Sequence, residues 1–398
     1  MPVCLGRWKL VAVACAVARN ARNFVNILAV DPSASVGGAQ LSLLDVLLGL
    51  QARGHSILLA APPNGNLLAA AAARGIRTEI WNLPHSLRRA GQYTNRLALL
   101  LSVLGAIRVL WSLAGIARRH HSHVVYSNGI KSHILTGLLR LFLWRPLVWH
   151  VRDFVSHRAI ARLLFPLARI TRISVIANSR AVAAEWHRRG VPAIVVHNGF
   201  HFQPQRNAEK NSGRLQLLTA GVLSAWKGFD IVLRACSFLP EHLGWQLTIC
   251  GGEIYETDGH LGERKRLEQL AEELAIANQV TFTGMVEDLG PYFQKSDILL
   301  HGSVRPEPFG RVVAEAMLAG VPVIASRGGG IPEIIRAGID GLLYPMGNAQ
   351  ELCNAICCLA EDTSRRSAMG KTARARILAD FSLDGKIDRI EQILITSS

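Results

Sequence analysis

Short apolar runs alternate with helical patterns along the whole chain, and this alternation constrains the fold more than any other feature. It is typical of parallel sheets whose strands are joined by crossover helices. The first series of predicted strands is Phe24–Val30, Ser56–Ala60, Val124–Tyr126, Leu147–His150, Ser174–Ala177 and Ala193–His197. The second series is Leu215–Ala220, Gln246–Cys250, Val280–Phe282, Ile298–Leu300 and Val321–Ala325. We therefore expect an α/β protein with two doubly wound, Rossmann-like domains facing a central cleft, where ligands bind at the carboxyl ends of the strands.

The length of the chain also favours two domains, because 398 residues exceed what one hydrophobic core usually supports. The polar stretch 203–214 separates the two strand series and predicts a linker. The expected organisation is an extension at 1–22, a first domain at 23–202, a second domain at 215–380 and a final segment at 381–398. A helix at Leu383–Leu394 in that final segment is expected to cross back onto the first domain.

The excess of basic over acidic residues is confined to the first half of the chain. Residues 1–200 hold 24 Lys and Arg against 5 Asp and Glu, a net charge of +19, whereas the remainder carries −4. A strongly basic half implies an anionic partner such as nucleic acid, an acidic glycan or lipid headgroups. Nucleic acid is disfavoured, because the arginines are interleaved with apolar runs and no known nucleic-acid-binding motif is present.

Two apolar segments bear on membranes. Arg7 and Lys9 precede the run Leu10–Ala18, which weakly resembles a signal peptide, but Arg19 and Arg22 follow at once and an N-terminal extension is favoured. Leu97–Ala117 is nearly long enough to span a bilayer, but Arg108 at its centre would cost about 2.5–3.5 kcal/mol. We expect a helix that packs in the first domain and dips partly into a membrane surface. The seven cysteines form no CxxC pair, which favours free thiols in a reducing cytosol.

The stretch from Glu307 to Glu315 predicts a ligand site. It reads as a loop ending in an acid, a helix that opens at Phe309 or Gly310, and a second acid inside that helix. A helix N-terminus offers unpaired N–H groups and a positive dipole end to a phosphate, and a glycine there lets an anion approach the backbone. Carboxylates accept hydrogen bonds from sugar hydroxyls. The combination predicts a ligand that is part phosphate and part sugar.

The same stretch resembles the E-x7-E signature of family 4 of the retaining GT-B glycosyltransferases, the group 1 type. The opening EPFG, the continuation AEAMLAGVPV and the following GGGIPE at Gly328–Glu333 all match that family at once. The string GGAQLSLLDVLLGLQARGHSILLAAP, which begins at Gly37, resembles the family's N-terminal motif. The resemblance implies a GT-B fold with an N-terminal acceptor-binding domain and a C-terminal nucleotide-sugar-binding domain.

The resemblance also implies roles for single residues. Glu315 is expected to bind the nucleotide ribose, Glu307 the donor sugar, and His150, at the end of a predicted strand, the same sugar. Lys227 and the N–H groups at Gly310 and Arg311 are expected to hold the diphosphate. The expected donor site further includes Phe309, Gly221, Gly37 and Gly38.

One position departs from the family pattern. The family usually has Arg directly after the first glycine of the Lys227 motif, and Val222 stands there. Either Arg305 or Arg311 substitutes for it, or activity is lower, or the donor geometry differs. The chain contains no Asp-x-Asp, the metal-binding mark of the other major glycosyltransferase fold. We therefore expect no required metal and no cofactor beyond the nucleotide-sugar co-substrate.

The expected reaction is retaining transfer of a hexosyl or related group to a lipid-linked or cell-envelope glycan, as in exopolysaccharide or lipopolysaccharide biosynthesis. In this family the donor's own phosphate oxygen is thought to take the acceptor proton while the protein stabilises the leaving group. The basic, apolar first half favours a cytoplasmic enzyme, peripheral at the inner face of the membrane. Two alternatives stay open: a sugar-nucleotide epimerase of GT-B fold, which product analysis would reveal, and an inactive nucleotide-sugar-binding scaffold, which donor hydrolysis or transfer would exclude.

Overall fold

The computed structural model describes residues 24–82, 96–140, 145–201, 213–253 and 262–397. These residues form two compact units. Unit 1 contains the described residues up to Asn178, then Ala183–Val196 and the chain from Leu383 onward. Unit 2 contains Ser179–Val182 and His197–Ser382. The predicted extension at 1–22 and most of the predicted linker lie outside the described residues.

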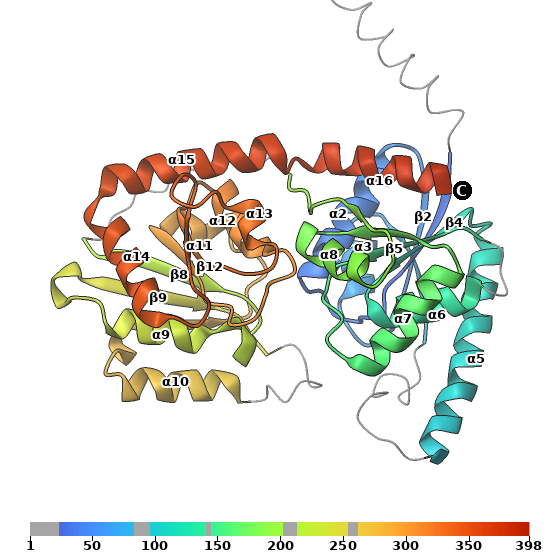
Figure 1. The fold of residues 1–398 in the computed structure, drawn as a ribbon, viewed down its shortest axis with the longest axis horizontal. Helices are drawn as coiled ribbons and strands as arrows, with labels where there is room; N and C mark the ends of the chain where they lie inside the picture. Colours follow the sequence, from blue (N-terminus) through green and yellow to red (C-terminus); the bar gives the residue numbers. More distant parts are fainter. Residues whose placement is uncertain (1–23, 83–95, 141–144, 202–212, 254–261, 398) are drawn as a thin grey trace, which may run out of the picture. The chain divides into compact units, whose positions relative to one another are not determined.

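Unit 1 is built on a seven-stranded parallel sheet with the strand order β3-β2-β1-β4-β5-β6-β7 (Figure 1). Its strands are β1 (Asn26–Val30), β2 (Ser56–Ala61), β3 (Arg77–Ile80), β4 (Val124–Asn128), β5 (Leu147–Val151), β6 (Ser174–Ala177) and β7 (Ile194–Val195). The central strands β1, β4 and β5 are buried along nearly their whole length. Burial on both faces explains why they appear in the sequence as continuous apolar runs.

Helices cover both faces of this sheet. They are α2 (Gly38–Ala52), α3 (Leu67–Ala72), α5 (Arg96–Arg119), α6 (Ile130–Arg140), α7 (Arg158–Ile170), α8 (Arg180–Arg188) and α16 (Leu383–Ser397). Side chains of α2, α3 and α16 form one core with β1, β2 and β4. On the other face, Trp149 of β5 stacks on His133 of α6 and meets Trp186 of α8 edge-on, and Trp186 packs in turn against Phe165 of α7.

The last helix, α16, packs against α2 within unit 1 (Figure 1). Its buried side chains Ile387 and Ile390 belong to the same core as α2. Arg53, which follows α2, forms ion pairs at 2.7 Å with both Asp388 and Glu391. The apolar contacts and the ion pairs together fix the end of the chain to unit 1.

Unit 2 repeats the plan with a six-stranded parallel sheet of order β10-β9-β8-β11-β12-β13. Its strands are β8 (Leu215–Ala220), β9 (Trp245–Cys250), β10 (Val280–Gly284), β11 (Ile298–His301), β12 (Val323–Ser326) and β13 (Leu342–Tyr344). The predicted fold class, two doubly wound parallel α/β domains, is confirmed.

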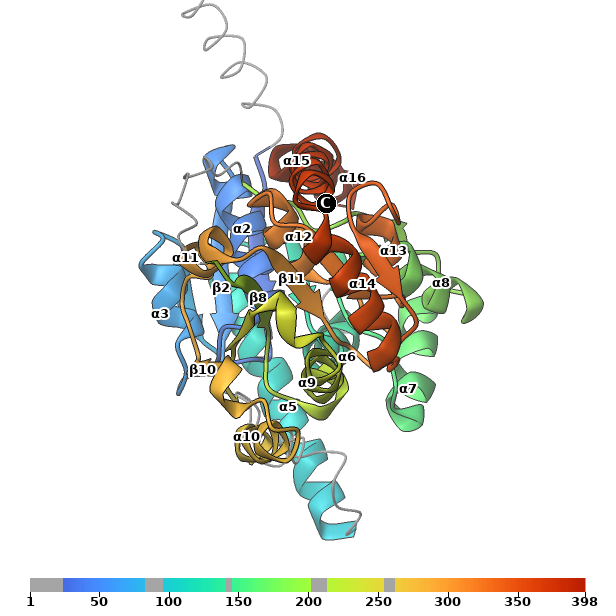
Figure 2. The same ribbon diagram turned by 90° about the vertical axis from the view of Figure 1, so that its left-hand side faces the viewer.

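The helices of unit 2 form two layers, which Figure 2 shows on opposite sides of β8 and β11. One layer comprises α9 (Phe229–Ser237), α10 (Glu263–Glu273) and α14 (Ala349–Glu361). The other comprises α11 (Gly290–Lys295), α12 (Arg311–Leu318), α13 (Ile331–Ile334) and α15 (Thr363–Asp380). Three short 3-10 helices, η1 (Ala225–Lys227), η2 (Glu241–Leu243) and η3 (Ala277–Gln279), complete the unit.

Two strands that the sequence did not predict lie at sheet edges. β3 reads RTEI and none of its residues is buried, so it lacks the apolar run that marks an inner strand. β13 has only three residues and pairs with β12 alone. An edge strand packs less of its surface than a central one, and its sequence carries a correspondingly weaker signal.

The described residues also bear on the membrane and cysteine predictions. The segment expected to be helical near Leu97–Ala117 is helical, as α5, but none of the described helices is long and apolar enough to cross a membrane. Within the described residues the cysteines are free thiols, and Cys236, Cys250 and Cys353 are buried. Cys4 and Cys15 lie outside them.

Candidate functional site

The centre of the candidate site in unit 2 is a loop that follows β8 and carries Lys227. This lysine ends the 3-10 helix η1, and Gly228 after it has a left-handed backbone with φ +64°. A Cβ on Gly228 would lie 2.1 Å from the carbonyl oxygen of Gly302, just beyond β11. Only glycine permits this approach, which holds the Lys227 loop against the end of β11.

Lys227 pairs with Glu307. Its ammonium donates to both carboxylate oxygens, at 2.9 and 2.8 Å, and it also lies 4.1 Å from the centre of the Trp226 ring. The two side chains are only 17% and 12% exposed. Burial alone would raise the pKa of Glu307, but the Lys227 charge and the neighbouring His301 hold it well below its ordinary value. Glu307 is therefore a carboxylate at neutral pH.

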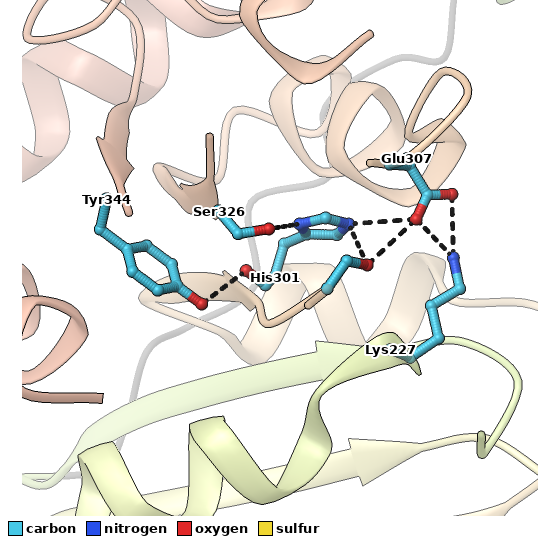
Figure 3. A network of polar contacts seen from close by, with 6 residues as sticks. Lys227, His301, Glu307, Ser326 and Tyr344 are labelled. Atoms are coloured by element: carbon cyan, nitrogen blue, oxygen red, sulfur yellow. Dashed lines mark hydrogen bonds and ion pairs between the residues drawn. The ribbon is translucent and has the colours of Figure 1, made fainter. Parts of the chain in front are cut away.

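A second group of polar side chains lies behind Glu307, and Figure 3 shows its members converging from three strand ends. His301, buried at the end of β11, lies with Nε2 3.5 Å from Glu307 Oε2 and 3.1 Å from the Ser303 hydroxyl. Its Nδ1 lies 3.3 Å from the hydroxyl of Ser326, which ends β12. Tyr344 of β13 donates to the His301 carbonyl at 3.2 Å. The sequence prediction missed these residues, although Ser303 stands four positions before Glu307 in the same loop.

The loop that carries Glu307 is held by the glycines after β12. Gly330 N–H donates to the Glu307 carbonyl at 2.8 Å. Gly329 has φ +61°, and a Cβ there would lie 1.9 Å from the same carbonyl oxygen. The GGG string therefore has a structural reason beyond the motif match, because it lets two loops lie backbone to backbone.

The helix α12 begins at Arg311, one or two residues later than predicted, and Gly310 is its N-cap. Gly310 has φ +101°, and a Cβ there would lie 2.2 Å from Ile331 Cδ1. The left-handed backbone angle thus favours glycine, and an added Cβ would also displace the end of the Ile331 side chain. Phe309, predicted at the donor site, is buried against Phe200 and Phe381.

The second acid, Glu315, pairs with Arg311 one turn earlier on α12, at 2.6 Å. The Arg311 guanidinium also lies over the Phe200 ring, 5.3 Å from its centre. Of the two arginines proposed to replace the missing family cation, Arg311 is therefore engaged with Glu315, and Arg305 is exposed. Gly221 and Val222 lie at the end of β8, where Gly221 N–H donates to the Cys250 carbonyl at 3.0 Å.

The predicted site residues of unit 1 lie at the carboxyl end of its own sheet. His150, in β5, is fully buried, and its Nδ1 contacts both the Tyr126 hydroxyl and the Arg152 guanidinium, the latter at 3.2 Å. A guanidinium only donates, so Nδ1 is the acceptor and Nε2 carries the proton. Burial first, and then the Arg152 charge, lower the pKa of His150 well below its ordinary value. Nε2 is buried without a hydrogen-bond partner among the described residues.

A chain of buried polar groups continues from Arg152. Its Nε donates to Asn128 Oδ1 at 2.7 Å, and Asn128 Nδ2 donates to Asp31 at 2.6 Å. Gln40 of α2 also donates to Asp31, at 3.2 Å. Burial raises the pKa of Asp31 to about 6 against these hydrogen bonds. The sequence prediction missed this network, although Asp31 and Asn128 both stand at the ends of apolar strands.

Gly37 and Gly38 lie at the start of α2, as predicted. Gly37 is the N-cap, in an extended conformation, and its N–H donates to the Gln40 side chain at 3.2 Å. The predicted residues therefore form two groups: Lys227, Glu307, Phe309, Gly310, Arg311, Glu315 and Gly221 in unit 2, and His150, Gly37 and Gly38 in unit 1. In the described part of the chain, no three His, Cys, Asp or Glu side chains are grouped to hold a metal ion.

Comparison with known proteins gives two family matches along the chain. The profile of "Glycosyl transferases group 1" matches residues 201–376, and that of "Glycosyltransferase Family 4" matches residues 36–203. The crystal structure of Anabaena HepE in complex with UDP and glucose has a TM-score of 0.80 and 26% identity, and the match covers 94% of this chain and all of HepE.

Curated relatives point the same way. The lipopolysaccharide core biosynthesis glycosyltransferase LpsE of Rhizobium meliloti is 29% identical over 42% of this chain and 46% of its own length. The lipopolysaccharide core biosynthesis mannosyltransferase LpcC of Rhizobium leguminosarum is 27% identical over 63% of this chain and 80% of its own. The chain thus spans about half the length of LpsE. Two matching profiles that together extend from residue 36 to residue 376, and a GT-B structure aligned over nearly the whole chain, show that this protein belongs to the group 1, family 4 glycosyltransferases of GT-B fold.

Proposed function

We propose that this glycosyltransferase is a retaining enzyme that moves a hexosyl or related group from a uridine diphosphate sugar to a lipid-linked or cell-envelope glycan. The observation that carries the proposal is the buried pair of Lys227 and Glu307 beside the N-terminus of α12. The pair places a cation and a fixed carboxylate in contact, and the carboxylate stands four residues before the start of α12. A diphosphate joined to a sugar needs these three groups.

The chemistry of each group supports a separate role. Lys227 is a compact cation suited to a phosphate oxygen, and it contacts both oxygens of Glu307 in the structure, so binding of the diphosphate requires its ammonium to turn from Glu307 toward the phosphate. The dipole of α12 adds positive potential at Gly310 and Arg311. Glu307, held as an anion, accepts from sugar hydroxyls rather than supplying a proton. Glu315, a quarter exposed on α12, is proposed to accept from the ribose hydroxyls.

The relatives support the choice of substrates. The structure of HepE contains UDP and glucose, which favours a uridine nucleotide for a chain that aligns with it over 94% of its length. The lipopolysaccharide core roles of LpsE and LpcC favour an envelope glycan as acceptor.

For the reaction we propose retention of anomeric configuration without an enzyme nucleophile. The donor's phosphate oxygen would take the acceptor proton as the glycosidic oxygen leaves. Lys227 and the α12 N-terminus would stabilise the charge that develops on the diphosphate, with no required metal ion. The expected contact of His150 with the donor sugar stays a prediction.

We further propose that unit 1 binds an anionic membrane surface at the cytoplasmic face. The outer side of α7 carries Leu163 and Ile170, which are 46% and 74% exposed and lie seven positions apart on one helix face. Arg162 and Arg169 are exposed beside them. Residues 96–178 contain 12 Lys and Arg and a single acid, Asp153. Exposed apolar side chains flanked by arginines suit the boundary between headgroups and acyl chains.

The test of the transferase proposal is a transfer assay with the purified full chain, UDP-sugars and extracted membrane glycolipid. NMR of the product is expected to show the same anomeric configuration as the donor. Lys227→Ala should slow transfer strongly, and Lys295→Ala, which alters an exposed lysine of α11, should not. An isomerised donor without transfer would favour the epimerase alternative. Neither transfer nor donor hydrolysis with any donor would favour the binding scaffold.

A further inference from the structure

The ammonium of Lys227 has two partners to serve, Glu307 and the donor diphosphate. His301 lies where it can support Glu307 when Lys227 binds the diphosphate. In the structure both oxygens of Glu307 accept from Lys227. In the proposed function, on which this inference rests, the same ammonium binds the donor diphosphate. When Lys227 turns to the phosphate, Glu307 loses its strongest partner while only 12% exposed. A buried carboxylate without partners is costly and tends to take up a proton.

The groups behind Glu307 form a directed chain of hydrogen bonds (Figure 3). The Ser303 hydroxyl lies 3.1 Å from Glu307 Oε2, which can only accept, so Ser303 donates. Its oxygen is then open to accept from His301 Nε2–H at 3.1 Å. His301 Nδ1 in turn accepts from Ser326 at 3.3 Å. These donor and acceptor roles satisfy every partner in the chain, with a proton on His301 Nε2 assigned from the hydrogen bonds.

The backbone of His301 is also held in place. Tyr344 donates to the His301 carbonyl at 3.2 Å, and both the histidine and the tyrosine are buried. Ser303 and Ser326 are buried as well. Glu307 lies 3.5 Å from the His301 ring, and Lys227 pairs with Glu307. The Tyr344 hydroxyl contacts the His301 carbonyl.

We propose that His301 is a positioning residue that, through Ser303, keeps Glu307 ionised and oriented when Lys227 turns to the donor diphosphate. Its direct separation from Glu307, 3.5 Å, also allows a weak second contact to the same oxygen. His301 touches no substrate in this proposal. It acts on catalysis only through Glu307.

The test compares three replacements at His301 in the full chain, with UDP-glucose as the probe. In His301→Gln the amide nitrogen reaches the place of Nε2 and can donate to Ser303, whereas in His301→Asn it replaces Nδ1 instead. His301→Leu provides no donor. We expect His301→Leu and His301→Asn to lower kcat at least about tenfold with the dissociation constant for UDP-glucose changed less than about threefold. His301→Gln should keep most of the wild-type kcat. His242→Leu, at an exposed histidine of η2, is the matched control.

A second readout does not depend on turnover. Calorimetry of UDP-glucose binding in buffers of different ionisation enthalpy measures the protons taken up on binding. The diphosphate of this donor has no proton to exchange near neutral pH. We expect His301→Leu to take up more protons than the wild type, increasingly so below about pH 7, because Glu307 becomes protonated when Lys227 leaves it.

Ser303→Ala tests the same hydrogen-bond chain without changing His301, so the inference stays testable if a histidine variant fails to fold. It removes one hydroxyl, and it should reproduce the loss of kcat seen in His301→Leu. The double variant should lose no more than either single one, since both break the same chain. The inference would be overturned if His301→Gln and His301→Leu lost kcat equally. It would also be overturned if His301→Leu kept the wild-type kcat and proton uptake. In either case the protein would still be an active transferase. A wild-type protein that neither binds nor turns over UDP-glucose or another UDP-sugar would instead overturn the proposed function and this inference with it.

Discussion

At the scale of single residues, the candidate site of unit 2 contains two ion pairs. One involves the loop before α12 and the other lies in the first turns of α12. Lys227 pairs with Glu307, and Arg311 pairs with Glu315. Each pair places a cation suited to phosphate beside an acceptor suited to hydroxyls. A nucleotide sugar offers both kinds of group, so its phosphate oxygens and hydroxyls can replace the contacts inside each pair.

The two glutamates are expected to respond differently to substitution. Glu315→Ala removes the proposed acceptor for the ribose hydroxyls, which should weaken UDP binding by about 1.5–3 kcal/mol, or roughly ten- to hundredfold. Glu307→Gln should lower kcat for transfer much more than UDP affinity, because its proposed contacts are to the sugar. Calorimetry and steady-state kinetics measure the two effects, with Glu272→Gln on the exposed face of α10 as control. If UDP binding collapses in Glu307→Gln and survives in Glu315→Ala, the two assignments are reversed.

Asp31 gives a prediction for the pH dependence of stability. Burial raises its pKa to about 6, so folding binds a proton at Asp31 below that pH. The associated stabilisation is complete below the ordinary pKa near 4 and is lost as the pH rises through about 6, by on the order of 3 kcal/mol. Asp31→Asn cannot lose this proton. The melting temperature of the variant should therefore gain on that of the wild type between about pH 4 and pH 7. Parallel curves for the two proteins would contradict the assignment.

At the scale of secondary-structure elements, the positions of strands and helices followed from the sequence where burial gave a clear pattern. The inner strands β6 and β8 begin and end where their apolar runs do. β3 was missed because RTEI lacks an apolar run, and β13 was missed because it has only three residues. The start of α12 was placed too early, because the left-handed angle at Gly310 excludes it from the helix.

The residues of the candidate site were likewise predicted only in part. The family resemblance predicted Lys227 and Glu307 from a motif, and the structure places them in contact. Ser326 and Tyr344 could not be found in this way, because they reach the site through the sheet order β11-β12-β13 rather than through spacing in the chain. Asp31 and Asn128 are brought together in the same manner by the pairing of β1 with β4.

Gly310 offers a test of how α12 is positioned. Gly310→Ala adds a Cβ at φ +101° and 2.2 Å from Ile331 Cδ1. Gly338→Ala is the matched control, since Gly338 has φ +80° with no atom within 4 Å of the added carbon. Both variants share the strain of a left-handed residue, about 1–2 kcal/mol, and only Gly310→Ala adds the overlap. We expect it to destabilise unit 2 further in denaturant unfolding and to weaken UDP binding. Equal effects of the two variants would show that Ile331 gives way without cost.

At the scale of the whole molecule, the net charge is distributed unevenly along the chain. Residues 1–200 carry +19 and the remainder −4, while the proposed donor site lies in unit 2. The basic part is therefore available for an acceptor or a membrane, and the donor site relies on a few local cations instead of a general positive field.

The charge division predicts binding to anionic vesicles. The full chain should bind vesicles that contain anionic lipid, because each basic residue near such a surface contributes about 1 kcal/mol. Binding should weaken as salt rises, since charges are screened beyond a Debye length, and should be poor on neutral vesicles. The double replacement Leu163→Ser and Ile170→Ser should reduce binding in co-sedimentation, whereas Ile339→Ser, at an exposed apolar residue of unit 2, should not. A chain that ignores anionic vesicles at low salt would favour a soluble, acidic acceptor.

The central claim is that the Lys227–Glu307 pair and the start of α12 form the site for a nucleotide-diphosphate sugar. Calorimetric titration of UDP into the wild type, Lys227→Ala and Lys295→Ala tests it most directly. We predict saturable binding to the wild type and to Lys295→Ala, and a loss of at least about tenfold in affinity for Lys227→Ala, where a charge-assisted contact to phosphate is removed. Equal affinity of all three proteins for UDP would contradict the claim.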